Sequence, residues 1–190
     1  MELGRIRIRL APIPDFAKVE YSPSQIEFYA RLTDLVYRAM NLDSVSNFLK
    51  ELVVTLDIRK DIEVRIMRLP AHRSRILGID KKGKILDEQL HGRSWKNKPL
   101  IDVFPDRLFP DKLSTPLLSV GLRGFILNSS IRAIIHEILH KSGLNDETRV
   151  RELTDYYYKD FRRRQLREFD DELKPLLKEW KQPKSGTYHS

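Results

Sequence analysis

Two histidines four residues apart, with a glutamate directly after the first, are the residues in this chain best suited to chemistry: His136-Glu137-Ile138-Leu139-His140. On a helix, residues four apart lie on the same side of adjacent turns, so the two imidazoles would point the same way. Two ring nitrogens placed in this way bind one Zn²⁺ at about 2.0–2.1 Å. Glu137 would then act on a water at the metal instead of binding the metal itself.

These residues are predicted to lie on one helix that starts near Asn128 and ends at Gly143. The hydroxyl oxygen of Ser129 or Ser130 would cap its start by accepting a hydrogen bond from an otherwise unpaired backbone N–H. Gly143 would end it, because glycine adopts the left-handed conformation without steric cost. The preceding residues 121–127 are expected to form a strand. An apolar stripe at helical spacing would face the core: Ile131, Ile134, Ile135 and Ile138.

The block from His136 to Glu147 resembles the zincin metallopeptidases, whose shared element is a His-Glu-x-x-His helix packed under a small twisted sheet. The resemblance covers about 25 residues and the order of strand and helix. It implies a peptide or protein substrate and a zinc ion that activates water. Glu137 would take the proton of that water as general base and pass it to the departing amine. An extended substrate would add to an exposed strand edge, with residues 100–104 or 121–127 as candidates.

The same resemblance leaves the third zinc ligand open among three acids. In a metzincin-like reading, Asp146 takes the third place, although the methionines of this chain all precede the motif, where that group has a methionine turn after it. In a gluzincin-like reading, the ligand is a glutamate of the next helix, and Glu147 is the predicted one, with Glu152 as the other candidate. Asp146 and Glu147 also suit the first turn of a helix because they oppose its dipole, so one can cap while the other binds.

Composition limits the other possibilities. The 190 residues contain no cysteine, which excludes disulfides and thiolate zinc sites and leaves histidine and carboxylates as metal ligands. The net charge of +8 leaves nucleic acid open as a partner. Two alternatives therefore remain: a basic zinc hydrolase acting on RNA or on nucleic-acid-bound protein, and a non-catalytic basic binding module.

The sequence lacks the apolar segments that are typical of secreted and membrane proteins. No apolar run approaches the roughly 18 residues that cross a bilayer, so no membrane partner is expected. The first nine residues alternate charged and apolar types, unlike a signal peptide, which predicts a cytoplasmic protein. Charged residues make up 33% of the chain, a fraction that suits a thermophile. The oligomeric state is left open.

The pattern of elements predicts an α+β domain over residues 1–181, followed by a disordered tail over 182–190. We expect a small, twisted, mostly antiparallel sheet packed with N-terminal helices, the His-Glu-x-x-His helix and a long C-terminal helix. Pro175 should kink or interrupt that last helix. The expected strands cover residues 4–10, 62–68 and 99–104, with a hairpin over 75–87 and a surface loop over 89–98. The expected N-terminal helices start at Pro23 and at Asp43 or Ser44.

Overall fold

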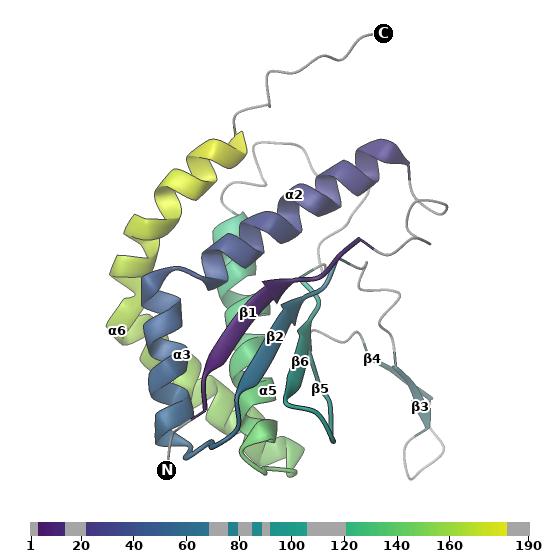
Figure 1. The fold of residues 1–190 in the computed structure, drawn as a ribbon, viewed down its shortest axis with the longest axis vertical. Coiled ribbons are helices and arrows are strands. Elements are labelled where there is room, and N and C mark those ends of the chain that lie inside the picture. Colours follow the sequence, from purple (N-terminus) through teal and green to yellow (C-terminus); the bar gives the residue numbers. More distant parts are fainter. Residues whose placement is uncertain are drawn as a thin grey trace, which may run out of the picture.

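The structure is a computed structural model, and it describes residues 4–13, 22–68, 76–79, 85–88, 92–105 and 121–181 (Figure 1). The first half of the chain contributes β1 (Ile6–Leu10), α2 (Pro23–Met40), α3 (Asp43–Thr55) and β2 (Ile62–Ile66). The second half contributes β3 (Ile76–Ile79), β4 (Ile85–Glu88), β5 (Gly92–Ser94), β6 (Leu100–Val103), a π-helical turn η2 (Ile126–Ile131), α5 (Arg132–Lys141) and α6 (Glu147–Lys181). The α+β class is confirmed.

The main sheet has four strands in the order β1-β2-β6-β5. β1 and β2 are parallel, β2 and β6 are parallel, and only β5 is antiparallel to its neighbour β6. The expectation of a mostly antiparallel sheet was therefore wrong for this sheet. Helices α2 and α3 connect β1 to β2, and such a crossover returns the chain to the same end of the sheet. The predicted hairpin of β3 and β4 is confirmed as a separate two-stranded sheet.

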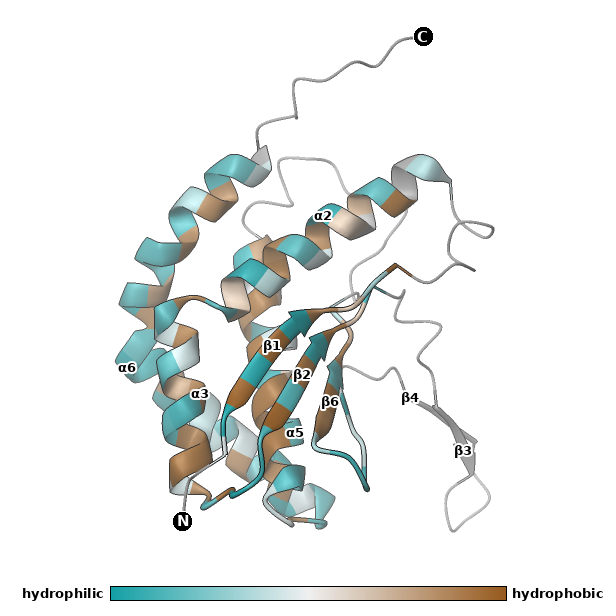
Figure 2. Cartoon of the chain, viewed as in Figure 1, coloured by the Kyte–Doolittle hydropathy of each residue, from teal (hydrophilic) through white to brown (hydrophobic). Residues whose placement is uncertain are grey.

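One face of the main sheet packs against the helices, and period-two alternation in the strands is the cause. In β2, Ile62, Val64 and Ile66 are fully buried, whereas Glu63 and Arg65 between them are only partly buried. Figure 2 shows this alternation of apolar and polar residues along β1 and β2. The apolar side shares one hydrophobic core with α2, α3, α5 and α6.

The segment before the His-Glu-x-x-His motif is helical, not a strand as expected. Residues 121–125 are α-helical, η2 follows without a break, and α5 continues to Lys141. No side chain caps α5, so the predicted cap at Ser129 or Ser130 was also wrong. Gly121 and Gly124 resemble strand punctuation, but Leu122, Phe125 and Ile126 stand at the i, i+3, i+4 spacing of a buried helix face.

Two expectations about strands need correction near the motif. Residues 92–94 form β5, whereas the sequence predicted a surface loop there. The candidate substrate edges were wrong as well, because β6 lies between β2 and β5 and residues 121–125 are helical. Among the described strands of the main sheet, the two edges are β1 and β5.

The C-terminal helix α6 is 35 residues long and packs along α5, α3 and α2 (Figure 1). It continues past Pro175 without interruption. Arg123 binds Asp170 with two hydrogen bonds of 2.6 and 2.7 Å, and Arg38 binds Glu179 in the same way. The tail predicted for 182–190 lies outside the described residues. Of the helices described, none combines the length and apolarity needed to cross a bilayer.

A buried carboxylate ties together three neighbouring strands of the sheet. Asp102 of β6 is completely buried, and its neighbours Ile101 and Val103 belong to the core shared with the helices, so its side chain lies on the opposite face of the sheet. Its Oδ1 accepts from Arg65 Nε at 2.8 Å, and its Oδ2 accepts from the Arg93 guanidinium and from Trp95 Nε1, each at 2.8 Å. Because these donors would lose their common acceptor together, Asp102 links β2, β6 and β5.

We expect Asp102→Asn to lower the free energy of unfolding by about 2–3 kcal/mol. The asparagine is neutral, and its NH2 group would replace one of the two oxygens that accept hydrogen bonds from Arg65, Arg93 and Trp95. Urea denaturation measures this change. Glu63→Gln on the neighbouring strand is the matched control and should cost less than about 1 kcal/mol, because that partly exposed carboxylate pairs only loosely with Arg9 at 3.6 Å. Equal losses in the two variants would contradict the role given to Asp102.

Candidate metal centre

Helix α5 holds both histidines on a side that its isoleucines leave free. Ile134, Ile135 and Ile138 are fully buried in the core. His136 and His140 are half-buried and lie beside this stripe, facing the start of α6. The core therefore fixes the rotation of the helix, and the two imidazoles project into the same space between α5 and α6.

The turn after α5 orients His140. Gly143 has a φ of 98°, a left-handed conformation that lets the helix end and the chain reverse, as the sequence predicted. The reversal brings the Leu144 carbonyl back to His140, whose Nδ1 lies 2.9 Å from that oxygen. A carbonyl only accepts, so Nδ1 of His140 carries the hydrogen and the lone pair of the neutral ring is on Nε2.

A threonine of α6 orients His136 in the same sense. The Thr154 hydroxyl donates to the Val150 carbonyl at 2.7 Å, so its oxygen is free to accept from His136 Nδ1 at 3.3 Å. The neutral His136 ring then also has its lone pair on Nε2. Burial is the main cause that lowers the pKa of His136, which favours this neutral form. Partners of this kind at Nδ1 are what metal-binding histidines have in proteins.

The two Nε2 atoms face each other at a distance of 3.2 Å. With both Nδ1 atoms protonated, two lone pairs point toward one space, and they repel each other unless a proton or a cation lies between them. Ligands about 2.05 Å from a tetrahedral zinc ion would lie about 3.3 Å apart. The pair therefore has the spacing of two zinc ligands.

Glu147 supplies the third group. Its Oε1 is 3.5 Å from Nε2 of His136, and its Oε2 is 3.4 Å from Nε2 of His140. The ligand atoms of these three residues all lie within 4.8 Å of one another. Arg151 also donates to Oε1 of Glu147 at 2.9 Å, which holds the carboxylate in place. Two imidazoles and one carboxylate form a donor set that zinc commonly has at catalytic sites, with one position left for water.

The other two acids that the sequence left open have different partners. Asp146 Oδ1 accepts from the backbone N–H of Arg149 at 2.8 Å, which is the bond of a helix cap at the start of α6. Glu152 is exposed and pairs with Arg149 at 3.1 Å. Of the three candidates, the structure brings only Glu147 to the histidines.

Glu137 lies between α5 and β5 in a tight space. It is buried, and burial raises the pKa of its carboxyl to about 7 against the lowering effect of His140 and of a backbone hydrogen bond from Ser94. Gly92 leaves the room for it, since a Cβ at residue 92 would lie 2.7 Å from Cγ of Glu137. A carboxyl with a pKa near 7 accepts and releases protons at neutral pH, as a general base needs.

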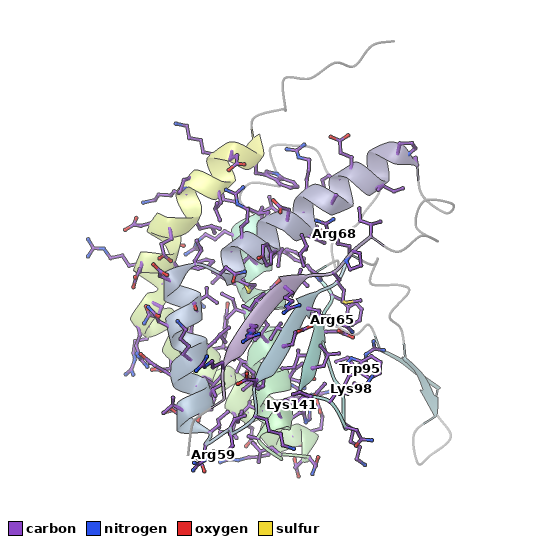
Figure 3. The ribbon with its side chains drawn as sticks, viewed as in Figure 1. Arg59, Arg65, Arg68, Trp95, Lys98 and Lys141 are labelled. Atoms are coloured by element: carbon purple, nitrogen blue, oxygen red, sulfur yellow. The ribbon has the colours of Figure 1, made fainter. Side chains whose placement is uncertain are left out.

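Lys141 fastens the turn between β5 and β6 to the same helix. Its Nζ donates to the carbonyl oxygens of Trp95 and of Lys98, the latter at 2.6 Å (Figure 3). Lys141 directly follows His140, so the β5–β6 turn is held at a fixed position relative to the histidines. Burial lowers the pKa of Lys141, and the charge of Glu137 opposes that shift.

Sequence reasoning missed the supporting residues: Thr154, Leu144, Gly92, Ser94 and Lys141. A signal existed for Thr154 only, because it lies seven residues after Glu147 and so shares its helix face two turns later. The others act through backbone groups, through a missing side chain or through a long-range contact, and no spacing in the sequence reveals these.

We expect Gly92→Ala to lower the free energy of unfolding by about 1–3 kcal/mol, because its Cβ would overlap the Glu137 side chain. Urea denaturation of Glu137→Ala and of the double variant completes a cycle. Gly92→Ala should be nearly neutral in the Glu137→Ala background, since the overlapping atoms are gone. The same cost in both backgrounds would show that Glu137 does not occupy this space.

We also expect the metal-free protein to lose stability as pH rises, relative to Glu137→Gln. The folded-state pKa of Glu137, about 7, is above its ordinary value of 4.5. The protonated carboxyl therefore contributes to the free energy of unfolding below pH 4.5, and this contribution is lost as the pH rises through 7. Relative to Glu137→Gln, the free energy of unfolding should fall by about 3 kcal/mol over this pH range. Chemical denaturation at a series of pH values measures it, and parallel curves for the two proteins would contradict it.

Comparisons of the chain with protein-family models, with curated proteins and with solved structures found no match. The functional interpretation therefore depends on the geometry of His136, His140, Glu147 and Glu137.

Proposed function

We propose that this protein is a zinc-dependent metallopeptidase, with His136, His140 and Glu147 as zinc ligands and Glu137 as general base. The observation that carries the proposal is the pair of Nε2 atoms 3.2 Å apart, each within 3.5 Å of a carboxylate oxygen of Glu147. Zinc bound there would lower the pKa of a coordinated water toward about 7 and polarise a carbonyl group.

The residues of the chain divide the remaining work. Thr154 and the Leu144 carbonyl hold the imidazoles in the ligating tautomer. The Glu137 carboxylate accepts a proton from the attacking water and then gives it to the departing amine. Its surroundings are dry, which keeps its pKa near 7 and so makes both transfers feasible at neutral pH.

Strand β5 supports a peptide as the substrate. It is an edge among the described strands, it borders Glu137, and it is three residues long. The backbone groups of an edge strand pair with an extended chain by strand addition. A peptide held in this way would lie along β5 with a carbonyl near the space between the histidines.

The decisive test combines zinc analysis with hydrolysis of an unstructured protein. We expect about one zinc per chain, and we expect His136→Ala, His140→Ala and Glu147→Gln each to lose it. Asp146→Asn and Glu152→Gln are the matched controls, and they should keep the zinc because their partners lie elsewhere. Glu137→Gln should keep the zinc and lose hydrolysis by about 10²–10⁴-fold.

Three results would contradict the proposal. A purified chain that binds no zinc, even after zinc is added, would reduce the site to a structural histidine cluster. Zinc with no hydrolysis of any peptide would favour a non-catalytic module. Hydrolysis retained by Glu137→Gln would remove this residue from its role as base.

A further inference from the structure

The outer face of the main sheet, on the side away from the helices, gathers arginines in register. Arg9 of β1 pairs with Arg65 of β2, Arg65 pairs with Asp102 of β6, and Asp102 pairs with Arg93 of β5. Residues in register on neighbouring strands have side chains on the same face, about 4.8 Å apart. One row across the sheet therefore holds three guanidinium groups and a single carboxylate.

A second row lies two residues further along the strands. Arg7 of β1, whose side chain is exposed, stands beside Glu63 of β2. Helix α5 lies behind the sheet in Figure 1 and packs against its apolar side. Figure 3 shows Trp95 and Lys98 close together beside the sheet. Within these two rows the arginines outnumber the carboxylates by two.

An aromatic ring lies at one end of the first row. The Arg93 guanidinium lies 4.3 Å from the ring centroid of Trp95, and the Lys98 ammonium lies 5.5 Å from it. The indole N–H of Trp95 donates to Asp102, the same carboxylate that holds Arg65 and Arg93. Asp102 therefore fixes a ring and two guanidinium groups in place, which lowers the entropy lost when a ligand binds.

These guanidinium groups have hydrogen atoms to spare. Each has five N–H groups in a planar fork, and Asp102 accepts from only one or two of each. The fork matches the geometry of phosphate oxygens, so the remaining N–H groups can bind them. A tryptophan beside such cations offers a surface on which a nucleobase stacks.

We propose that this outer face, made of Arg7, Arg9, Arg65, Arg93 and Trp95, binds single-stranded nucleic acid. The arginines contact the phosphates, and the indole of Trp95 stacks with a base. A single strand fits better than a duplex, because the bases of a duplex are stacked on one another and closed to the ring. The proposal does not depend on the metal centre.

The face and the metal centre share strand β5. Arg93 lies on the outer face, whereas Gly92 and Ser94 on either side of it contact Glu137. A nucleic acid bound across the outer face would thus lie next to the edge where a peptide is proposed to add. Proteins carried by nucleic acid are the class of substrate that this arrangement would favour.

Fluorescence anisotropy with labelled oligo(dT) and oligo(U) of about 20 nucleotides tests the proposal. Affinity should fall between about 50 and 200 mM salt. The slope of the logarithm of the association constant against the logarithm of the salt concentration should be about −0.7 per phosphate contacted. Arg7→Gln/Arg9→Gln should weaken binding about 10-fold or more and make the salt slope shallower by about 1.4, because two phosphate contacts are lost. The matched control is Arg162→Gln/Arg167→Gln, which removes the same charge from exposed positions on α6 and should change affinity less than about twofold.

Trp95 gives a second, independent signal. The chain has two tryptophans, Trp95 and Trp180, and Trp180 packs against Phe28 on α2. In a Trp180→Phe variant, the remaining fluorescence comes from Trp95, and stacking of a base should quench it at the concentrations that raise the anisotropy. Glu137→Gln should bind the oligonucleotides as the unmodified chain does.

Several outcomes would overturn the proposal. Equal weakening by the two double variants would show diffuse attraction by net charge. Anisotropy without quenching in Trp180→Phe would place the nucleic acid elsewhere. Vesicles rich in phosphatidylserine that bind through Arg7 and Arg9, with no binding of the oligonucleotides, would assign the face to an anionic membrane. Full affinity of Arg7→Gln/Arg9→Gln would exclude this face altogether.

Discussion

Two imidazole lone pairs directed at one another, 3.2 Å apart, are the feature on which the candidate site depends. The Leu144 carbonyl accepts the Nδ1 hydrogen of His140, and the Thr154 hydroxyl lies 3.3 Å from Nδ1 of His136, where its oxygen accepts in the same way. Two facing lone pairs are unfavourable unless a proton or a cation lies between the rings. The residues that surround the pair are best understood by how they maintain it.

The long helix α6 is central to that task. It supplies Glu147 at its first turn and Thr154 two turns later, and both meet the histidines on α5. Further along, contacts of α6 with Arg123 and with Ser44 of α3 fasten it to the rest of the core. The length of this helix thus anchors one side of the site far from the site itself, which limits how much the carboxylate of Glu147 can move.

Strand β5 has a comparable role on the other side. Its backbone lies so close to α5 that residue 92 has no room for a side chain beside Glu137. Lys141 and Asp102 hold the two ends of the β5–β6 turn, one from helix α5 and one from inside the sheet. The same short strand therefore sets the surroundings of the proposed base and places Arg93 and Trp95 on the outer face.

The sequence by itself determined the local features. The alternation in 62–66, the isoleucine stripe of α5 and Gly143 each follow from the period or conformational preference of a few adjacent residues, and the spacing of His136 and His140 places both on one helix side. Only the tertiary structure decided the rest. Residues 121–131 are helical and lead into the motif helix, β5 is a strand, and the sheet is mixed. Glu147 reaches the histidines, whereas Asp146 caps a helix and Glu152 pairs with Arg149. The physical reason is that periodicity tells which side of an element is buried, whereas the neighbour on that side depends on strand register and on the angle of a turn.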